Sequence, residues 1–235
     1  MSIKTPFSKE NLDFCLKELG KEFRRLSGKS MPAEIILIGG ASILANYGFR
    51  EMTYDIDAVI MASSAMKNAV NRVGDKLGFP NGWLNMDFSK TKSYSHKLIE
   101  VSIYYKTFSN ILTVRTVAAE YLIAMKLMSG RQYKNDLSDV VGILWEHEKS
   151  GNPIERETIN KAVATLYAYP LPDNSLHFID DAFNSGDYKQ IYHKIRKNEQ
   201  QAKEILLDFE QDYPNTLKEE NITSIIEKAK QKKKL

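Results

Sequence analysis

The stretch IILIGGASILANYGFREMTYDIDAVI, residues 35–60, decides the fold class of this chain because it joins an apolar strand to a glycine pair. The run from Glu34 to Ile38 is rich in β-branched residues and predicts a buried strand that ends at Gly39-Gly40. A helix is predicted to follow over residues 41–47. Glycines between a strand and a helix let backbone N–H groups approach an anion, which the helix dipole also attracts. The stretch therefore predicts an anion-binding turn.

Two carboxylates, Asp55 and Asp57, close the same stretch at the start of a strand predicted over residues 55–61. Because successive strand residues alternate between the two faces, side chains two residues apart point to the same side. The two like charges repel, and a divalent cation between them relieves the repulsion. Mg²⁺ prefers such hard oxygen ligands together with substrate phosphates. An anion-binding turn beside a metal pair indicates phosphoryl or nucleotidyl transfer.

Each of these features also has a simpler interpretation. A glycine pair after a strand is usually a tight turn, Asp55 can cap a turn, and Asp57 can be a surface residue at a strand start. Ile56 between the two carboxylates and the apolar run over residues 58–61 favour a core strand instead. Unpaired charge is costly there, so the combined stretch favours a functional interpretation.

The rest of the chain divides into a mixed half and a helical half. Apolar periodicity predicts helices over residues 8–27 and 63–77, the second capped by Ser63 or Ser64, and strands over residues 98–105 and 111–114. From Val117 onward the pattern is helical. We therefore predict an α/β protein: a core with an N-terminal helix over residues 1–148, built on a small mixed β-sheet flanked by helices, and an all-helical C-terminal lobe over residues 149–235.

Composition excludes several other classes of protein. The 235 residues are 43% hydrophobic and 27% charged, which indicates a globular chain with a sizeable core. A single cysteine, Cys15, excludes an internal disulfide and a cysteine-cluster metal site. The apolar runs are too short to span a bilayer, so we expect a cytoplasmic protein with no membrane partner. The net charge of +3 is only a weak indication of a nucleic-acid partner.

The glycine pair followed by Asp55-Ile56-Asp57 resembles the signature of the DNA polymerase β-like nucleotidyltransferase superfamily. More narrowly, the chain resembles the nucleotidyltransferase-like toxins of prokaryotic toxin–antitoxin and abortive-infection systems, of the AbiEii type. Three further segments support the narrower resemblance: the run Arg50 to Asp57, the element Gly82-Trp83-Leu84-Asn85, and the helix Glu120 to Arg131 with Asn135 to Asp139. The resemblance covers about residues 30–148.

The resemblance implies a role for each matching residue. Gly39, Gly40 and Ser42 would hold the triphosphate of a nucleotide, and Asp55 and Asp57 would bind Mg²⁺. Lys126 and Arg131 would meet the nucleotide, while Asp136 or Asp139 would complete the site or hold Lys126 in place. The superfamily uses a third carboxylate on a later strand, for which Glu100 is the candidate here.

Two of these roles have structural alternatives. Glu100 can equally be a solvent-facing strand residue. Lys126 sits on an apolar helix and can simply extend to solvent, while Arg131 and Asp136 form a surface ion pair.

The function implied is Mg²⁺-dependent transfer of a nucleotide from a nucleoside triphosphate to a hydroxyl, with release of pyrophosphate. The resemblance also implies a toxin that acts on tRNA or another cellular acceptor and has a cognate antitoxin. Two alternatives stay open: a catalytically weak relative that works as a binding module, and a small-molecule nucleotidyltransferase of the antibiotic-modifying kind.

The C-terminal half has two interpretations of its own. It contains tyrosines at positions 167, 169, 188 and 192 and basic residues at positions 189, 194, 196 and 197. These residues suit either a nucleic-acid surface or a plain helical bundle with an exposed basic face.

Overall fold

The computed structural model describes residues 6–131, 133–218 and 220–232, and within them a five-stranded mixed sheet forms the centre of the first half. The strands are β1 (Ala33–Leu37), β2 (Ile56–Met61), β3 (Leu84–Asn85), β4 (Ser102–Phe108) and β5 (Leu112–Val117). Their spatial order is β3-β2-β1-β5-β4. The central strand β1 pairs antiparallel with β2 and parallel with β5. The predicted α/β class is confirmed.

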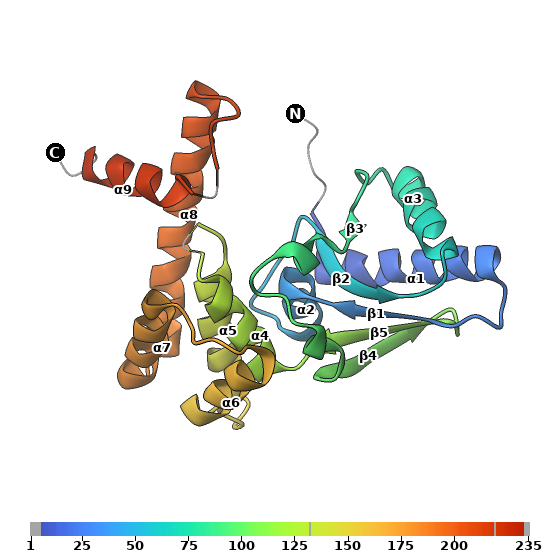
Figure 1. Ribbon diagram of the computed structural model, residues 1–235, viewed down its shortest axis with the longest axis horizontal. Coiled ribbons are helices and arrows are strands. Elements are labelled where there is room, and N and C mark those ends of the chain that lie inside the picture. Colours follow the sequence, from blue (N-terminus) through green and yellow to red (C-terminus); the bar gives the residue numbers. More distant parts are fainter. Residues whose placement is uncertain (1–5, 132, 219, 233–235) are drawn as a thin grey trace.

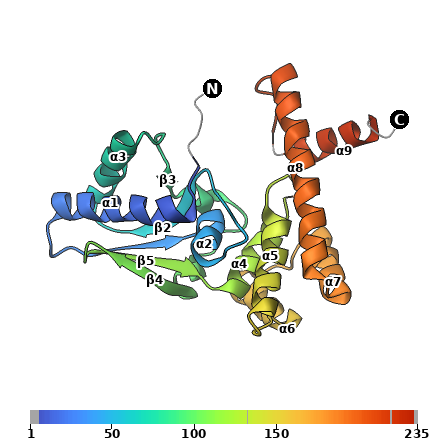
Figure 2. The same cartoon turned by 180° about the vertical axis from the view of Figure 1, so that it is seen from behind.

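Helices cover the sheet and continue beyond it (Figure 1). They are α1 (Lys9–Ser27), α2 (Gly39–Asn46), α3 (Ala65–Leu77), α4 (Ala119–Ser129), α5 (Asp136–Lys149), α6 (Arg156–Leu166), α7 (Asp173–Ser185), α8 (Tyr188–Asp212) and α9 (Ile222–Lys232). Viewed from behind, α1 and α3 lie along one face of the sheet, while α4 to α8 gather at one end of it (Figure 2). Among the described residues, no helix combines the length and apolar character needed to cross a membrane.

Local signals explain the ends of the first helices. Ser8 and Asn11 exchange side-chain and backbone hydrogen bonds at the start of α1, which satisfies two of the free N–H groups of its first turn. Gly78 ends α3 in the left-handed conformation, with φ +72°. The predicted serine cap of α3 is wrong. Ser64 precedes the helix without a side-chain cap, and the buried hydroxyl of Ser63 has no hydrogen-bond partner among the described residues.

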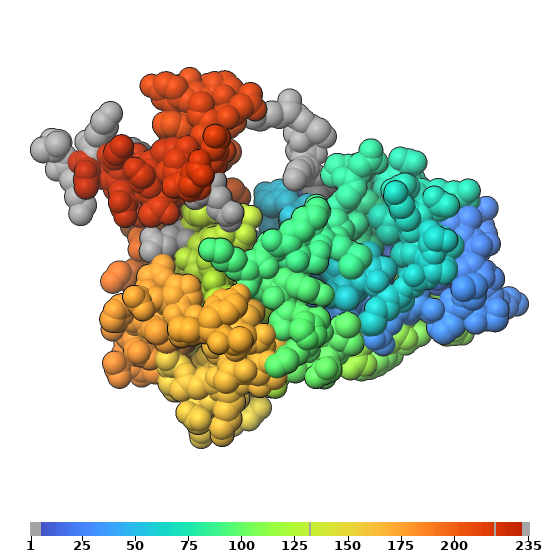
Figure 3. All heavy atoms as spheres, viewed as in Figure 1, coloured from blue at the N-terminus to red at the C-terminus, as the bar shows by residue number. Residues whose placement is uncertain are grey.

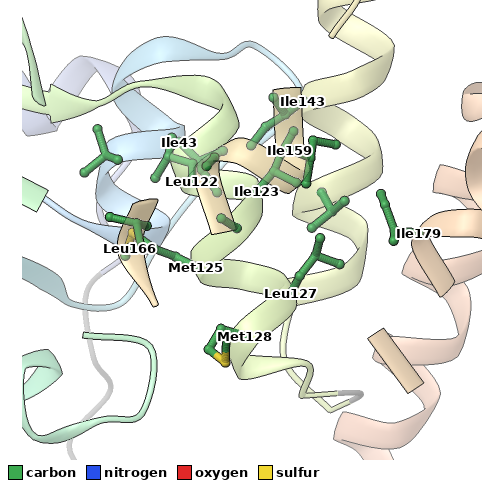
Figure 4. Packing of buried hydrophobic residues seen from close by; sticks show 14 of the residues in the cluster. Ile43, Leu122, Ile123, Met125, Leu127, Met128, Ile143, Ile159, Leu166 and Ile179 are labelled. Atoms are coloured by element: carbon green, nitrogen blue, oxygen red, sulfur yellow. The ribbon is translucent and has the colours of Figure 1, made fainter. Parts of the chain in front are cut away.

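Two apolar cores hold the elements together. The first packs α1 and α3 against one face of the sheet through residues such as Leu16, Val70 and Ile35. The second joins the other face of the sheet to the helices and is centred on α4, in which every residue from Leu122 to Met128 is buried (Figure 4). A helix that is buried all round supports its neighbours on every side, so α4 connects the sheet to the helical half.

The later strands begin and end further along the chain than predicted. A 3₁₀ turn over His96–Ile99 replaces the first residues of the predicted strand, and β4 begins only at Ser102. Leu98 is fully buried in this turn, so its apolar character reflects core packing rather than a strand. Glu100 consequently lies in a turn and is exposed.

Three of the four tyrosines of the helical half are buried, whereas Tyr169 is half exposed. Tyr167, Tyr188 and Tyr192 are at most 9% exposed. The hydroxyls of Tyr167 and Tyr169 donate to the backbone carbonyls of Ser93 and Lys92, at 2.7 and 3.0 Å. These bonds tie the helical half to the loop between β3 and β4. Tyr167, Tyr188 and Tyr192 therefore pack inside the protein, and the interpretation of the helical half as a nucleic-acid surface stays a prediction.

Candidate nucleotide-binding site

The site begins where β1 ends and β2 starts. Because the two strands are antiparallel, these ends meet, and the N–H of Ile38 donates to the carbonyl of Asp57 at 2.8 Å. Gly39 follows directly and starts α2 with φ +53°, a value that favours glycine. A side chain at Gly40 would lie 2.7 Å from the guanidinium of Arg50. Both glycines of the predicted anion-binding turn are therefore required by the local backbone or its neighbours.

The segment before β2 is held from two sides. Phe7 and Thr53 form an isolated β-bridge with N–H to carbonyl distances of 2.7 and 2.9 Å. Phe7 is 1% exposed and packs on Phe79 and Trp83. The Thr53 hydroxyl donates to the carbonyl of Asp55 at 3.2 Å. The residues at the chain's beginning thus position the backbone that carries the first carboxylate.

The two carboxylates behave as a pair of crowded like charges. Burial and the charge of Asp55 raise the pKa of Asp57 to about 6. Ile56 between them is fully buried, which holds both residues at the start of the core strand. Within the described part of the chain no cluster of three or more histidine, cysteine or acidic side chains forms a metal site. Two carboxylates that repel each other nevertheless fit Mg²⁺, which commonly takes one or two protein carboxylates and completes its shell with phosphate and water.

A buried chain of alternating charges lies beside the carboxylates. The ammonium of Lys126 is 2.9 Å from a carboxylate oxygen of Asp136 and 2.9 Å from one of Asp139. Arg131 binds Asp136 at 2.8 Å, and Arg50 binds Asp139 at 2.5 Å. The side chains of Lys126 and Asp136 are only 11% and 1% exposed, so the interpretation of Lys126 as a solvent-reaching lysine with a surface ion pair nearby is wrong.

The pKa shifts within this group of buried charges follow from the ion pairs that they form. Burial alone would lower the pKa of Lys126, but Asp136 and Asp139 outweigh it and hold that pKa above its usual value. Burial opposes ionisation of Asp136, yet Lys126 and Arg131 hold its pKa well below its usual range. Lys126 and Asp136 are therefore both charged at neutral pH, and the contacts with Asp136 and Asp139 hold Lys126 in place.

A cavity of about 270 Å³ brings these elements together. Its lining is Gly39, Gly40, Arg50, Thr53, Asp55, Asp57, Asp87, Phe88, Thr91, Ser93, Leu122, Met125, Lys126, Ser129, Arg131, Lys134, Asn135 and Asp136. Glycines, carboxylates and cations make up one part of the wall, and Phe88, Leu122 and Met125 give it an apolar part. Another cavity, of about 320 Å³, lies beside α6 and has no ionisable lining except two tyrosines.

Three predicted site residues lie outside this lining. Ser42 is fully buried, and its hydroxyl accepts a hydrogen bond from the N–H of Val117 at 3.1 Å. Glu100 is in the exposed turn before β4. Asp139 lies one step behind the wall and reaches the cavity only through Lys126 and Arg50.

The structure adds residues that the sequence interpretation missed. Asn85 pairs with Asp57 across β3 and β2, and Asp87 two residues later enters the lining from the same side. The Gly82–Asn85 element was the available signal for this edge of the cavity. Lys134 enters from the loop before α5, where partial burial and Arg131 lower its pKa.

One buried carboxylate of the helical half contacts the helix that carries Asp136 and Asp139. Glu199 of α8 is 4% exposed, and one of its oxygens accepts the N–H of Ser138 in the first turn of α5, at 3.2 Å. Its other oxygen is buried without a partner among the described residues. Burial and the charge of Asp139 raise the pKa of Glu199 to about 7, against the effect of Ser138. Glu199 therefore links α8 to the helix that carries Asp136 and Asp139.

A mixed sheet with a glycine turn and two carboxylates facing a cluster of cations defines a nucleotidyltransferase-like protein. The chain belongs to the family described as "Nucleotidyltransferase of unknown function (DUF6036)", whose model matches residues 15–149. The match includes every residue of the cavity lining. No curated protein and no solved structure matches the chain.

Proposed function

We propose that the protein is a Mg²⁺-dependent nucleotidyltransferase that moves a nucleotide from a nucleoside triphosphate to a hydroxyl acceptor. The observation that carries this proposal is the single cavity that unites the glycine turn, the Asp55 and Asp57 carboxylates and the cations at positions 126, 131 and 134. Membership in a nucleotidyltransferase family supports the same reaction class.

The triphosphate would lie along the polar wall of the cavity. The N–H groups at the start of α2, at Gly39 and Gly40, would bind its negative charge, which the helix dipole also favours there. Arg131 and Lys134 add positive charge to the same lining. The base would then occupy the apolar part lined by Phe88.

Asp55 and Asp57 would hold Mg²⁺, which supplies charge neutralisation for phosphoryl chemistry when it is bound. The cation would also stabilise the ionised form of Asp57, whose pKa is otherwise raised.

In the reaction the acceptor oxygen forms a bond to the α-phosphorus, the bond from that phosphorus to the bridging oxygen breaks, and pyrophosphate leaves. We assign the hydroxyl proton to Asp87, because Asp136, the other further carboxylate of the lining, is taken up by Lys126 and Arg131. Such a displacement needs positioning and charge neutralisation more than covalent help from the protein.

The test is transfer of label from each α-labelled nucleoside triphosphate, with Mg²⁺ and total tRNA, by the native protein and an Asp55→Asn/Asp57→Asn variant. Label incorporated by the native protein alone supports the proposal, and the labelled species identifies the acceptor. Label in a small molecule keeps the reaction class but moves the acceptor. Mg²⁺-dependent nucleotide binding without transfer to any acceptor would refute the enzymatic function and leave a binding module.

The resemblance to AbiEii-type toxins extends the proposal to a biological role. We propose a cytoplasmic toxin with tRNA as acceptor and a cognate antitoxin as partner. Growth arrest on expression of the native chain, abolished by Asp55→Asn/Asp57→Asn, tests the toxic role separately from the chemistry.

A further inference from the structure

The first part of α8 carries positive charge that acidic neighbours leave unbalanced. Residues 188–203 contain one acidic residue, the buried Glu199, and five basic residues: Lys189, Lys194, Arg196, Lys197 and Lys203. Within the described ranges none of these five forms an ion pair, whereas Arg25 and Lys76 on α1 and α3 are paired with glutamates. Unbalanced charge on an exposed helix face is typical of a surface that binds an anionic partner.

Three of the five basic residues form a stripe on one side of the helix. Lys189, Arg196 and Lys203 are spaced by seven residues, or nearly two helical turns, so they lie on one side at intervals of about 10 Å. We call these three residues the basic stripe. Tyr192, between the first two, donates to the carbonyl of Phe49 at 3.2 Å. The side that carries the basic stripe therefore borders the segment leading to Asp55.

The last residue of the basic stripe reaches an exposed aromatic ring beside the cavity. The ammonium of Lys203 lies 5.3 Å from the ring centroid of Tyr54. Tyr54 is 44% exposed and directly precedes Asp55. An exposed ring next to a row of cations provides the two contacts that single-stranded nucleic acids use, base stacking and phosphate pairing.

We propose that the basic stripe and Tyr54 form the binding surface for a single-stranded nucleic acid that serves as the acceptor. The inference rests on the proposed function, since it takes the cavity as the site of nucleotide transfer. Phosphates of the strand pair with the basic stripe, and a base stacks on Tyr54. The terminal hydroxyl of the strand then lies next to Asp55, which directly follows Tyr54.

Two observations favour this partner over an acidic protein or a duplex. The row of cations leads to the cavity that receives a nucleotide, and Tyr54 adds a ring that an acidic peptide does not need. A cavity of about 270 Å³ is too small to admit a duplex. Figure 3 shows the later part of α8, with α9, projecting beyond the sheet half.

The test measures binding of a fluorescein-labelled 12-nucleotide single-stranded RNA by fluorescence anisotropy over a range of NaCl concentrations. The stripe variant is Lys189→Gln/Arg196→Gln/Lys203→Gln. Its matched control, Lys17→Gln/Lys29→Gln/Lys67→Gln, removes the same charge from exposed positions away from α8. Both proteins are also tested for Mg²⁺-dependent ATP binding, which neither set of changes should alter.

We expect the stripe variant to bind RNA at least tenfold more weakly than the native protein and the control. Its slope of log K against log salt should fall by about 2, because each phosphate contact to a single strand contributes about 0.7. Tyr54→Ala should weaken binding about tenfold with an unchanged slope, and Tyr54→Phe should restore it, because stacking needs the ring but not the hydroxyl.

Equal RNA affinity of the stripe variant and its control would overturn the inference. Displacement of the RNA by an equal charge of poly-glutamate, with Tyr54→Ala indistinguishable from native, would also overturn it and identify an acidic protein as the partner. Failure of the proposed function is recognised differently. The native protein would then transfer no nucleotide to any acceptor, while the dependence of RNA binding on the stripe would be unaffected.

Discussion

Replacing Glu199 by glutamine should change the pH dependence of stability in a direction that the structure determines. Glu199 is buried, and its pKa rises from 4.5 to about 7 on folding. The native state therefore keeps a proton that the unfolded chain has already lost between pH 4.5 and 7. A group with a raised pKa contributes its full stability below its unfolded pKa and loses it as pH rises through the folded pKa.

The magnitude follows from the size of the shift. A difference of one pKa unit corresponds to about 1.4 kcal/mol. Ionisation of Glu199 therefore lowers the free energy of unfolding of the native protein by at most about 3 kcal/mol between pH 4.5 and pH 8. Glutamine has nearly the same shape, still offers an oxygen to the N–H of Ser138, and never ionises. We expect Glu199→Gln to be more stable than the native protein at pH 8 by up to that amount, and nearly equal at pH 4.5.

The assay is equilibrium urea unfolding at pH 4.5, 6 and 8, followed by the fluorescence of Trp83 and Trp145. Subtracting the two proteins at each pH removes the titration of every other group. Glu204→Gln, an exposed change on the same helix, is the matched control and should differ from native equally at all three values. A difference for Glu199→Gln that does not grow between pH 4.5 and 8, or a variant less stable at pH 8, would refute the reasoning.

Three further substitutions test the framework of the site, each by urea unfolding and by Mg²⁺-dependent ATP binding. Lys126→Met should cost roughly 3 kcal/mol, the low end for breaking a buried ion pair, because each aspartate keeps an arginine; no loss would contradict the buried charge chain. Gly39→Ala should cost about 1 kcal/mol of stability, because φ is positive at this position, and should also weaken ATP binding. Gly78→Ala, at the end of α3, places alanine at a similar positive φ and should leave ATP binding unchanged. Phe7→Ala should cost about 3–5 kcal/mol of stability and weaken ATP binding through Thr53. Phe7→Leu should keep most of the stability and most of the ATP binding. Full ATP binding by Phe7→Ala at temperatures where it is folded would show that the β-bridge between Phe7 and Thr53 does not position the site.

The parts of the fold that local pattern determines were predictable from the sequence. Helical periodicity over residues 8–27 and the β-branched run before Gly39 correspond to α1 and β1. Asp55 and Asp57 were predictable as neighbours of the glycine turn because a single 26-residue stretch carries both features. The spacing of nearby residues is enough to predict local structure where the strand pattern and the turn residues indicate the same structure.

The rest of the site depends on contacts between distant segments. Ser42 looks like a phosphate ligand in sequence, yet its hydroxyl is taken up by Val117, 75 residues away. Glu100 has the alternating pattern of a strand, but the burial of Leu98 turns the chain before β4 begins. Asp87 follows a two-residue strand that is too short to show periodicity. Which carboxylate enters the cavity is thus decided by tertiary packing.

The hydroxyls of Tyr167 and Tyr169, bonded to the loop at Ser93 and Lys92, have a consequence for how this family can be dissected. Ser93 belongs to the cavity wall, so the wall rests on residues that follow the end of the family match at residue 149. A fragment cut there would lose these two anchors and would expose to water the side of α4 that packs against α6. Boundaries taken from sequence similarity would therefore yield a recombinant piece with Asp55 and Asp57 intact and the wall of the cavity unsupported.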